Sequence, residues 1–377
     1  MAQLVFVHGV ATRDTPEYRN SVSNRNMLFR ELLFTGKDVT FHSPMWGHYV
    51  PSIPPSVFKT NARSVGTFSL NAGGAYGMGT GLMGNVTGGG NADVSIGAIG
   101  KQDPIAALDA ICSQVADQVA AQNRAYKPEE LQAFRVAAEL MALNKSSTLF
   151  DGKASPQSIA AQFNANGPKS LGVGSFISDA VEAVTDRVRN VVSTLGFNAV
   201  RGNLTPAIGL FMSDVFVYLK DGDVRRNIQK VIADSLINAH QKAKAEKVPL
   251  VVIGHSMGGV ILVDMLNDAA AAGLPVDLSV DALLTVGSQP GFFAALDLIS
   301  QNLPTQSARQ RADCIKHWFN VFDPIDPLAF RADMIFNGVI DLEFNSVAGI
   351  SEAHSKYFQR PQFYVRARER LQESSVL

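Results

Sequence analysis

Residues 251–262 of this 377-residue chain read Val-Val-Ile-Gly-His-Ser-Met-Gly-Gly-Val-Ile-Leu, and the organisation of the rest of the chain follows from them. The apolar run before Gly254 predicts a buried parallel strand, and the apolar segment after Ser256 is competent to form a helix. Gly254 and Gly258 lack a Cβ, so strand and helix can approach closely while Ser256 adopts a strained conformation between them. The pattern predicts a strand, a sharp turn that presents a serine hydroxyl, and a helix whose first backbone amides point towards that hydroxyl.

The turn itself reads Gly-His-Ser-Met-Gly-Gly, with His255 before the serine and Met257 after it. In this setting it resembles the nucleophile elbow of the α/β-hydrolase superfamily, in particular its lipase and esterase branch. The resemblance implies an α/β fold with a mostly parallel central sheet flanked by helices, and it implies that Ser256 is the nucleophile. A tight strand-to-helix turn that merely contains a serine is the structural alternative.

The composition, with 46% apolar residues and a formal net charge of -1, suits one large α/β domain with an insertion, or two unequal domains. The near-neutral charge gives no electrostatic reason to expect a nucleic-acid partner. Cys112 and Cys314 both lie in apolar periodic segments, where buried thiols are more common than a disulfide. The N-terminus lacks the basic region of a secretion signal, and no apolar segment is long enough for a transmembrane helix, so a cytoplasmic protein is expected.

The expected hydrolase core has two parts, residues 1–48 and residues 204–377, which carry the elbow and the downstream acid and base. The segment between them, residues 49–203, is expected to be a helical and glycine-rich insertion, or cap. Residues 66–100 are rich in glycine, carry Asp93 as their only charge and predict a loop.

The expected elements are strands and helices, read from their hydrophobic periodicity. Strands are expected over residues 4–7, 37–43, 249–253, 280–286, 314–321 and 339–344, and helices over residues 24–33, 104–125, 128–143, 176–195, 224–243 and 257–271.

His8, Gly9 and Val10 follow the first expected strand. In the α/β-hydrolase family a His-Gly dipeptide at this place supplies half of the oxyanion hole, so the resemblance implies that the backbone amides of Val10 and Met257 bind the oxyanion. Trp46 follows the second expected strand, where the resemblance places it on the substrate side. Simple core packing is the alternative for Trp46.

A serine nucleophile needs a histidine to accept its proton and a carboxylate to orient that histidine. In the resembled fold the chain order is serine, acid, histidine. His317 and His354 are the two histidines downstream of the elbow. His317 lies in an expected strand, whereas His354 follows the last one, in Ala-His-Ser-Lys-Tyr, which resembles the family's catalytic ending.

For the acid, residues 322–328 read Phe-Asp-Pro-Ile-Asp-Pro-Leu and place two carboxylates after a strand. The resemblance indicates Asp326 as the acid, with Asp323 as a turn former or a supporting carboxylate. The reversed roles remain an alternative, and Glu352 beside the histidine is another.

Together these residues predict a serine hydrolase that cleaves carboxylic esters, with hydrophobic acyl groups or lipids favoured, through a Ser-His-Asp triad and an acyl-enzyme. No metal or cofactor is expected, because the chain has neither a Cys/His cluster nor a nucleotide fingerprint. Residues 66–100 and the amphipathic pattern of 176–195 raise the alternative of an antibacterial or defence effector that degrades lipids, contacts a membrane through the insertion and is activated by self-assembly or a partner. Thioesterase or amidase chemistry, and an inactive binding module, stay open as well.

Overall fold

A computed structural model describes residues 1–51, 96, 100–101, 104–142, 145–150, 155–166, 177–184, 209, 211–299, 309–349 and 352–377. Its centre is a six-stranded sheet in the order β2-β1-β3-β4-β6-β8, in which every neighbouring pair is parallel. The strands are β1 (Ala2–Val7), β2 (Val39–His42), β3 (Leu250–His255), β4 (Val280–Val286), β6 (Ile315–Phe322) and β8 (Val339–Glu343). Strands β5 (Arg309–Gln310) and β7 (Phe336–Asn337) form a separate parallel pair.

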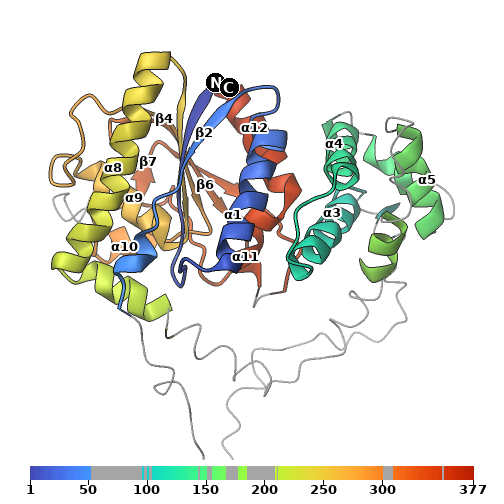
Figure 1. The fold of residues 1–377 in the computed structure, drawn as a ribbon, viewed down its shortest axis with the longest axis horizontal. Coiled ribbons are helices and arrows are strands. Elements are labelled where there is room, and N and C mark those ends of the chain that lie inside the picture. The colour runs from blue at the N-terminus through green and yellow to red at the C-terminus, as the bar shows by residue number, and fades with distance from the viewer. Residues whose placement is uncertain are drawn as a thin grey trace, which may run out of the picture.

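Helices cover both faces of the sheet, so the chain belongs to the α/β class (Figure 1). One face carries α8 (Asp223–Glu246), α9 (Met257–Asn267) and α10 (Pro290–Ala295), and the other carries α1 (Pro16–Leu28), its π-helical continuation η1 (Phe29–Leu33) and α12 (Pro361–Glu373). Alternate side chains of β1 explain this division: Leu4 and Phe6 join the cluster that includes Leu28 and Tyr364, whereas Val5 joins the α8 and α9 side.

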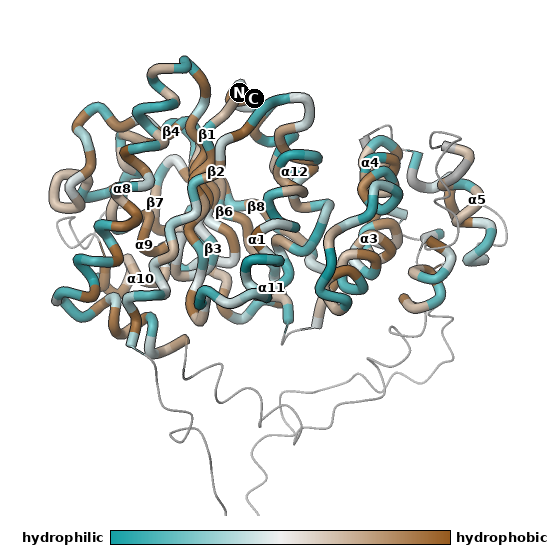
Figure 2. Tube along the Cα trace, in the orientation of Figure 1, coloured by the Kyte–Doolittle hydropathy of each residue, from teal (hydrophilic) through white to brown (hydrophobic). Residues whose placement is uncertain are grey.

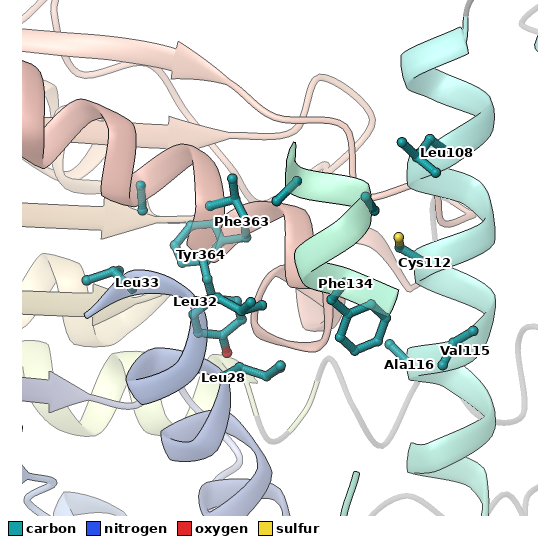
Figure 3. Packing of buried hydrophobic residues seen from close by; sticks show 14 of the residues in the cluster. Leu28, Leu32, Leu33, Leu108, Cys112, Val115, Ala116, Phe134, Phe363 and Tyr364 are labelled. Atoms are coloured by element: carbon teal, nitrogen blue, oxygen red, sulfur yellow. The ribbon is translucent and has the colours of Figure 1, made fainter. Parts of the chain in front are cut away.

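A second group of helices lies outside α1 and α12, on the right of Figure 1. These are α3 (Pro104–Ala121), α4 (Pro128–Ala142), η4 (Ser146–Phe150) and α5 (Pro156–Asn166). Figure 3 shows side chains from α3, α4, α12 and the α1–η1 segment in one apolar cluster. In Figure 2 the strands are largely hydrophobic, and the helices around them show both hydrophobic and hydrophilic residues. The described helices of the expected insertion therefore pack beside the core.

The expected strands and most expected helices are present within a few residues of their predicted ends. Helix α1 begins at Pro16, well before residue 24, because Thr15 caps it: the Thr15 hydroxyl accepts a hydrogen bond from the Tyr18 amide at 3.2 Å. Helix α12 is not among the elements expected from the sequence. Residues 177–184 are helical, but nearly all of 66–100 and the remainder of 176–195 lie outside the described residues.

Two further expectations concern the cysteines and the membrane. Cys112 and Cys314 are both free thiols, and Cys112 is buried, as expected. Among the residues that the structure describes, no helix is long and apolar enough to cross a bilayer. The division into residues 1–48, 49–203 and 204–377 stays a prediction.

Candidate active site

Ser256 occupies the sharp turn between β3 and α9, with φ 51° and ψ -128°, a backbone conformation that L-residues rarely adopt. The neighbouring glycines make this turn possible. A Cβ on Gly254 would lie 2.5 Å from the Cα of Gly259, and a Cβ on Gly258 would lie 2.3 Å from the carbonyl oxygen of Val7. Strand, turn and helix thus touch through backbone alone, as the sequence predicts.

Three side chains from distant parts of the chain form one hydrogen-bonded row. His354 Nε2 lies 2.8 Å from the hydroxyl oxygen of Ser256, and His354 Nδ1 lies 2.9 Å from Asp326 Oδ2 and 3.2 Å from Oδ1. Because an ionised carboxylate only accepts hydrogen bonds, Nδ1 carries the proton and Nε2 is left to accept the serine proton. Ser256 and Asp326 are buried, whereas 19% of the His354 side chain is exposed.

His255, inside the elbow, holds the backbone of His354. Its Nε2–H donates to the carbonyl oxygen of His354 at 2.9 Å. Burial lowers the pKa of His255 to about 3, so the ring stays neutral and keeps this donor in place at physiological pH. The ring also packs against Phe358, with centroids 5.5 Å apart. The elbow residue next to the serine therefore also positions the histidine.

A tyrosine completes the surroundings of Asp326. The Tyr357 hydroxyl donates to Asp326 Oδ2 at 2.9 Å, and the amide of Leu328 donates to Asp326 Oδ1 at 2.9 Å. Burial, followed by the nearby Asp326 charge, raises the pKa of Tyr357, which keeps its hydroxyl protonated. This role of Tyr357 could not be predicted from the sequence, although the residue lies only three residues after His354, because a contact with an acid 31 residues away leaves no local signal.

The carboxylate of Asp323 accepts hydrogen bonds from nearby backbone amides. Its Oδ1 accepts from the Ile325 amide at 3.1 Å and its Oδ2 from the Ser346 amide at 2.8 Å. The amide of Asp323 in turn donates to the Tyr357 hydroxyl oxygen at 2.8 Å. These contacts are those of a turn former and supporting carboxylate for Asp323. Asp326 is the carboxylate that contacts the His354 ring.

The loop after β1 passes directly over the serine. A Cβ on Gly9 would lie 2.8 Å from the Cβ of Ser256, so only glycine fits at this crossing. The loop is tied down two residues later, where the amide of Ala11 donates to the buried carboxylate of Asp214 at 2.7 Å. Arg13 pairs with the same carboxylate at 2.9 Å. This places the Val10 stretch beside the elbow.

Met257 is the first residue of α9, where a helix has backbone amides without intrahelical partners. The carbonyl of Ser256 is held by the hydroxyl of Ser288, which donates to it at 2.6 Å. The helix therefore presents its amino end at the serine, as the elbow pattern predicts.

Trp46 is completely buried and packs on His8. Its indole N–H donates to the His8 carbonyl oxygen at 2.7 Å, its backbone amide donates to His8 Nε2 at 3.2 Å, and the two rings stack with centroids 4.9 Å apart. Burial lowers the pKa of His8 to about 3, in keeping with a neutral ring whose Nε2 accepts a hydrogen bond. The core-packing alternative for Trp46 agrees with this placement, and the substrate-side alternative does not.

The other two candidates do not join the row. His317 lies within β6, with its ring stacked on Phe319 at 6.4 Å between centroids. Glu352 is the N-cap residue of α11 (Ala353–Lys356), the single helical turn that carries His354.

The assembled groups can perform acyl transfer: an imidazole contacts a serine hydroxyl and is oriented by a buried carboxylate. Within the described parts of the chain, no three or more His, Cys, Asp or Glu side chains are grouped so that they could hold a metal ion. Comparison with protein-family models, curated proteins and solved structures finds no match for this chain.

Proposed function

We propose that this chain is a serine hydrolase of the α/β-hydrolase type that cleaves carboxylic esters, with Ser256 as nucleophile, His354 as base and Asp326 as the acid. The observation that carries the proposal is the row of hydrogen bonds, 2.8 Å from Ser256 to His354 and 2.9 Å from His354 to Asp326. The strained serine at the start of α9 supports it, because an elbow of this kind presents the hydroxyl at the carboxyl edge of a parallel sheet.

The proposed reaction proceeds by two displacements. His354 accepts the Ser256 proton as the serine oxygen bonds to the ester carbonyl carbon, and the backbone amides of Val10 and Met257 stabilise the oxyanion. His354 then gives that proton to the leaving alcohol as the carbon–oxygen bond breaks. Water, deprotonated by His354, hydrolyses the acyl-enzyme and frees Ser256.

A preference for hydrophobic acyl groups is supported by side chains at the same edge of the sheet as Ser256. Phe292 and Leu296 follow β4, and Ile325 and Phe330 follow β6; all four side chains are exposed. The rings of Phe292 and Phe330 stack with centroids 4.8 Å apart. The exposed Phe292–Phe330 pair is an apolar surface whose chemistry fits an acyl chain or a lipid surface.

The test is labelling with a fluorophosphonate probe, with the modified residue identified by mass spectrometry, and hydrolysis of p-nitrophenyl esters across acyl lengths with and without phospholipid vesicles. We expect labelling at Ser256 and hydrolysis that favours longer acyl chains. Ser256→Ala should lose at least about 10⁴-fold in turnover while unfolding at the same temperature. An unlabelled wild-type protein without activity on esters, thioesters or amides would contradict the proposal and favour the inactive binding module.

A labelled wild-type protein that hydrolyses none of these substrates in dilute solution, and becomes active when concentrated, would favour an effector activated by assembly. That alternative rests on residues 66–100 and 176–195, most of which lie outside the described part of the chain.

A further inference from the structure

His354 is carried by a short element with little stability of its own. Helix α11 has four residues and continues into η5 (Tyr357–Gln359), itself only three residues long. A single helical turn does not hold its shape without outside contacts, because nucleating a helix costs more free energy than one turn returns. The position of His354 must therefore depend on what α11 and η5 are tied to.

One carboxylate from α3 ties down the chain on the C-terminal side of His354. Asp117 Oδ1 accepts from Lys356 Nζ at 3.0 Å and from Arg360 Nη1 at 2.8 Å. The Arg360 side chain is fully buried, and those of Asp117 and Lys356 are only 12% and 16% exposed. The two cations bracket η5, one on each side, so a single acidic group on α3 fixes both ends of this turn.

Arg360 extends the connection to two more segments. Its Nε donates to the carbonyl oxygen of Ser346 at 2.6 Å, and its Nη1 also donates to the carbonyl oxygen of Ser113 on α3 at 3.2 Å. Ser346 is the residue whose amide donates to Asp323. The segment after β8, the turn that carries the base and helix α3 thus meet around one buried guanidinium, and Ser346 links this segment to Asp323 in the loop of the acid.

We propose that Asp117 is a positioning residue for His354: helix α3, from the expected insertion, holds the proposed catalytic base in register with Ser256 and Asp326. The inference rests on the proposed function for its effect on turnover, but the placement of the histidine can be measured separately. A buried cation that loses its anion is strongly disfavoured, so we expect removal of the Asp117 charge to displace Arg360 in spite of its hydrogen bonds to Ser346 and Ser113. In enzymes, a misplacement of about 1 Å in a reacting group can lower the rate about a hundredfold.

The same helix offers a matched control. Asp109 lies two turns earlier on α3 and accepts from Arg366 of α12 at 2.6 Å, so it also joins α3 to the C-terminal segment through a carboxylate and a guanidinium. Arg366 lies in the middle of α12, and Arg360 directly precedes that helix. Replacing Asp109 weakens the docking of α3 without releasing the turn that carries His354.

The experiment compares Asp117→Asn with Asp109→Asn in the full chain by two readouts. The first is the rate constant of fluorophosphonate labelling at Ser256. The second is the far-downfield proton resonance of the His354 Nδ1–H bonded to Asp326, which reports the placement of the histidine without any turnover. For Asp117→Asn we expect labelling to slow by about tenfold or more and the resonance to shift or disappear, whereas Asp109→Asn stays within about twofold of wild type with the resonance intact.

Restoration of both readouts by Asp117→Glu would support the proposal. It is overturned if Asp117→Asn folds with wild-type labelling and an unchanged resonance, or if both asparagine variants lose labelling in proportion to their loss of thermal stability. If Asp117→Asn does not fold, Lys356→Met, which removes one of the two cations and leaves the Asp117–Arg360 pair, decides by the same readouts. A wild-type protein that shows the resonance but is not labelled would contradict the proposed hydrolase, and the resonance of the variants would still test the positioning role.

Discussion

The nucleophile and its two partners are held in place by different kinds of structure. Ser256 is fixed by the backbone of residues 254–259, where missing Cβ atoms let β3, α9 and the loop after β1 touch. His354 and Asp326 are fixed by side-chain hydrogen bonds from residues far away in the chain, above all His255 and Tyr357. The elbow is part of the buried core of the sheet, whereas the acid and the base lie on turns at the edge of the sheet.

This difference separates two kinds of damage. A substitution in the elbow disturbs backbone contacts between buried elements, so it should lower the stability of the whole fold. A substitution in the turns that carry the acid or the base alters hydrogen bonds within the site, so it should lower activity more than stability. Tyr357 joins the turn of the base to the loop of the acid, since its hydroxyl contacts both Asp326 and the amide of Asp323.

The largest expected effect is that of Asp326→Asn. The new amide would either direct an N–H group towards the His354 Nδ1–H or force the imidazole into its other tautomer. In the other tautomer, Nε2 carries the proton and has no free lone pair to accept the Ser256 proton. We expect turnover of p-nitrophenyl esters to fall about 10⁴-fold with little change in the unfolding temperature.

The matched control is Asp323→Asn, which removes the charge and keeps a carbonyl oxygen for only one of the two amides, Ile325 or Ser346, that Asp323 accepts from. It should lower the unfolding temperature and cost far less activity than Asp326→Asn. Equal losses of activity from the two substitutions would contradict the assignment of the acid.

The next effect concerns the elbow. Gly258→Ala would place a Cβ 2.3 Å from the carbonyl oxygen of Val7 and 2.5 Å from that of His8, both backbone atoms that cannot move without shifting β1. We expect a loss of about 3 kcal/mol in the free energy of unfolding, measured by urea denaturation. The control is Gly349→Ala, where a new Cβ meets no atom within 4 Å, and it should change the same quantity by less than about 0.5 kcal/mol. Similar losses for both glycines would remove the distinction between elbow and turns.

Much of the fold could be predicted because its signals are local. The strands of a parallel sheet are short runs of mostly apolar residues, and all six expected strands have their counterparts in the structure within a few residues. The elbow could be predicted for the same reason, since Gly254, Ser256 and Gly258 lie within five residues of each other. Helix α12 was missed because its buried residues, such as Phe363 and Leu371, are interleaved with arginines and glutamines that hide the apolar stripe.

The partners of the site are different, because their contacts join residues that are distant in the chain. The resemblance to a family, and not periodicity, indicated His354 and Asp326, and the structure brings both to Ser256. No pattern in the sequence links Tyr357 to Asp326, or Asp117 to Lys356. Trp46 illustrates the reverse case, where a resemblance offered a substrate-side role and the local packing on His8 argues for a place in the core.

The smallest expected effect comes from His255, which belongs to the elbow and yet holds the base turn. Its folded pKa of about 3 lies below the ordinary value of about 6.5, so the unfolded chain binds a proton that the folded chain does not, and stability falls as the pH is lowered from about 6.5. Between pH 6 and 5 this histidine should contribute a loss of about 1.2 kcal/mol in the free energy of unfolding. His255→Gln keeps an N–H donor for the His354 carbonyl but cannot titrate, so its urea denaturation should show a pH dependence that is shallower by that amount. An unchanged slope would mean that the ring is not held neutral by burial. The contact between His255 and the His354 carbonyl would then titrate with pH. The distinction between a nucleophile fixed by backbone and partners fixed by side chains would not hold at His255, which belongs to the elbow and also contacts the turn of the base.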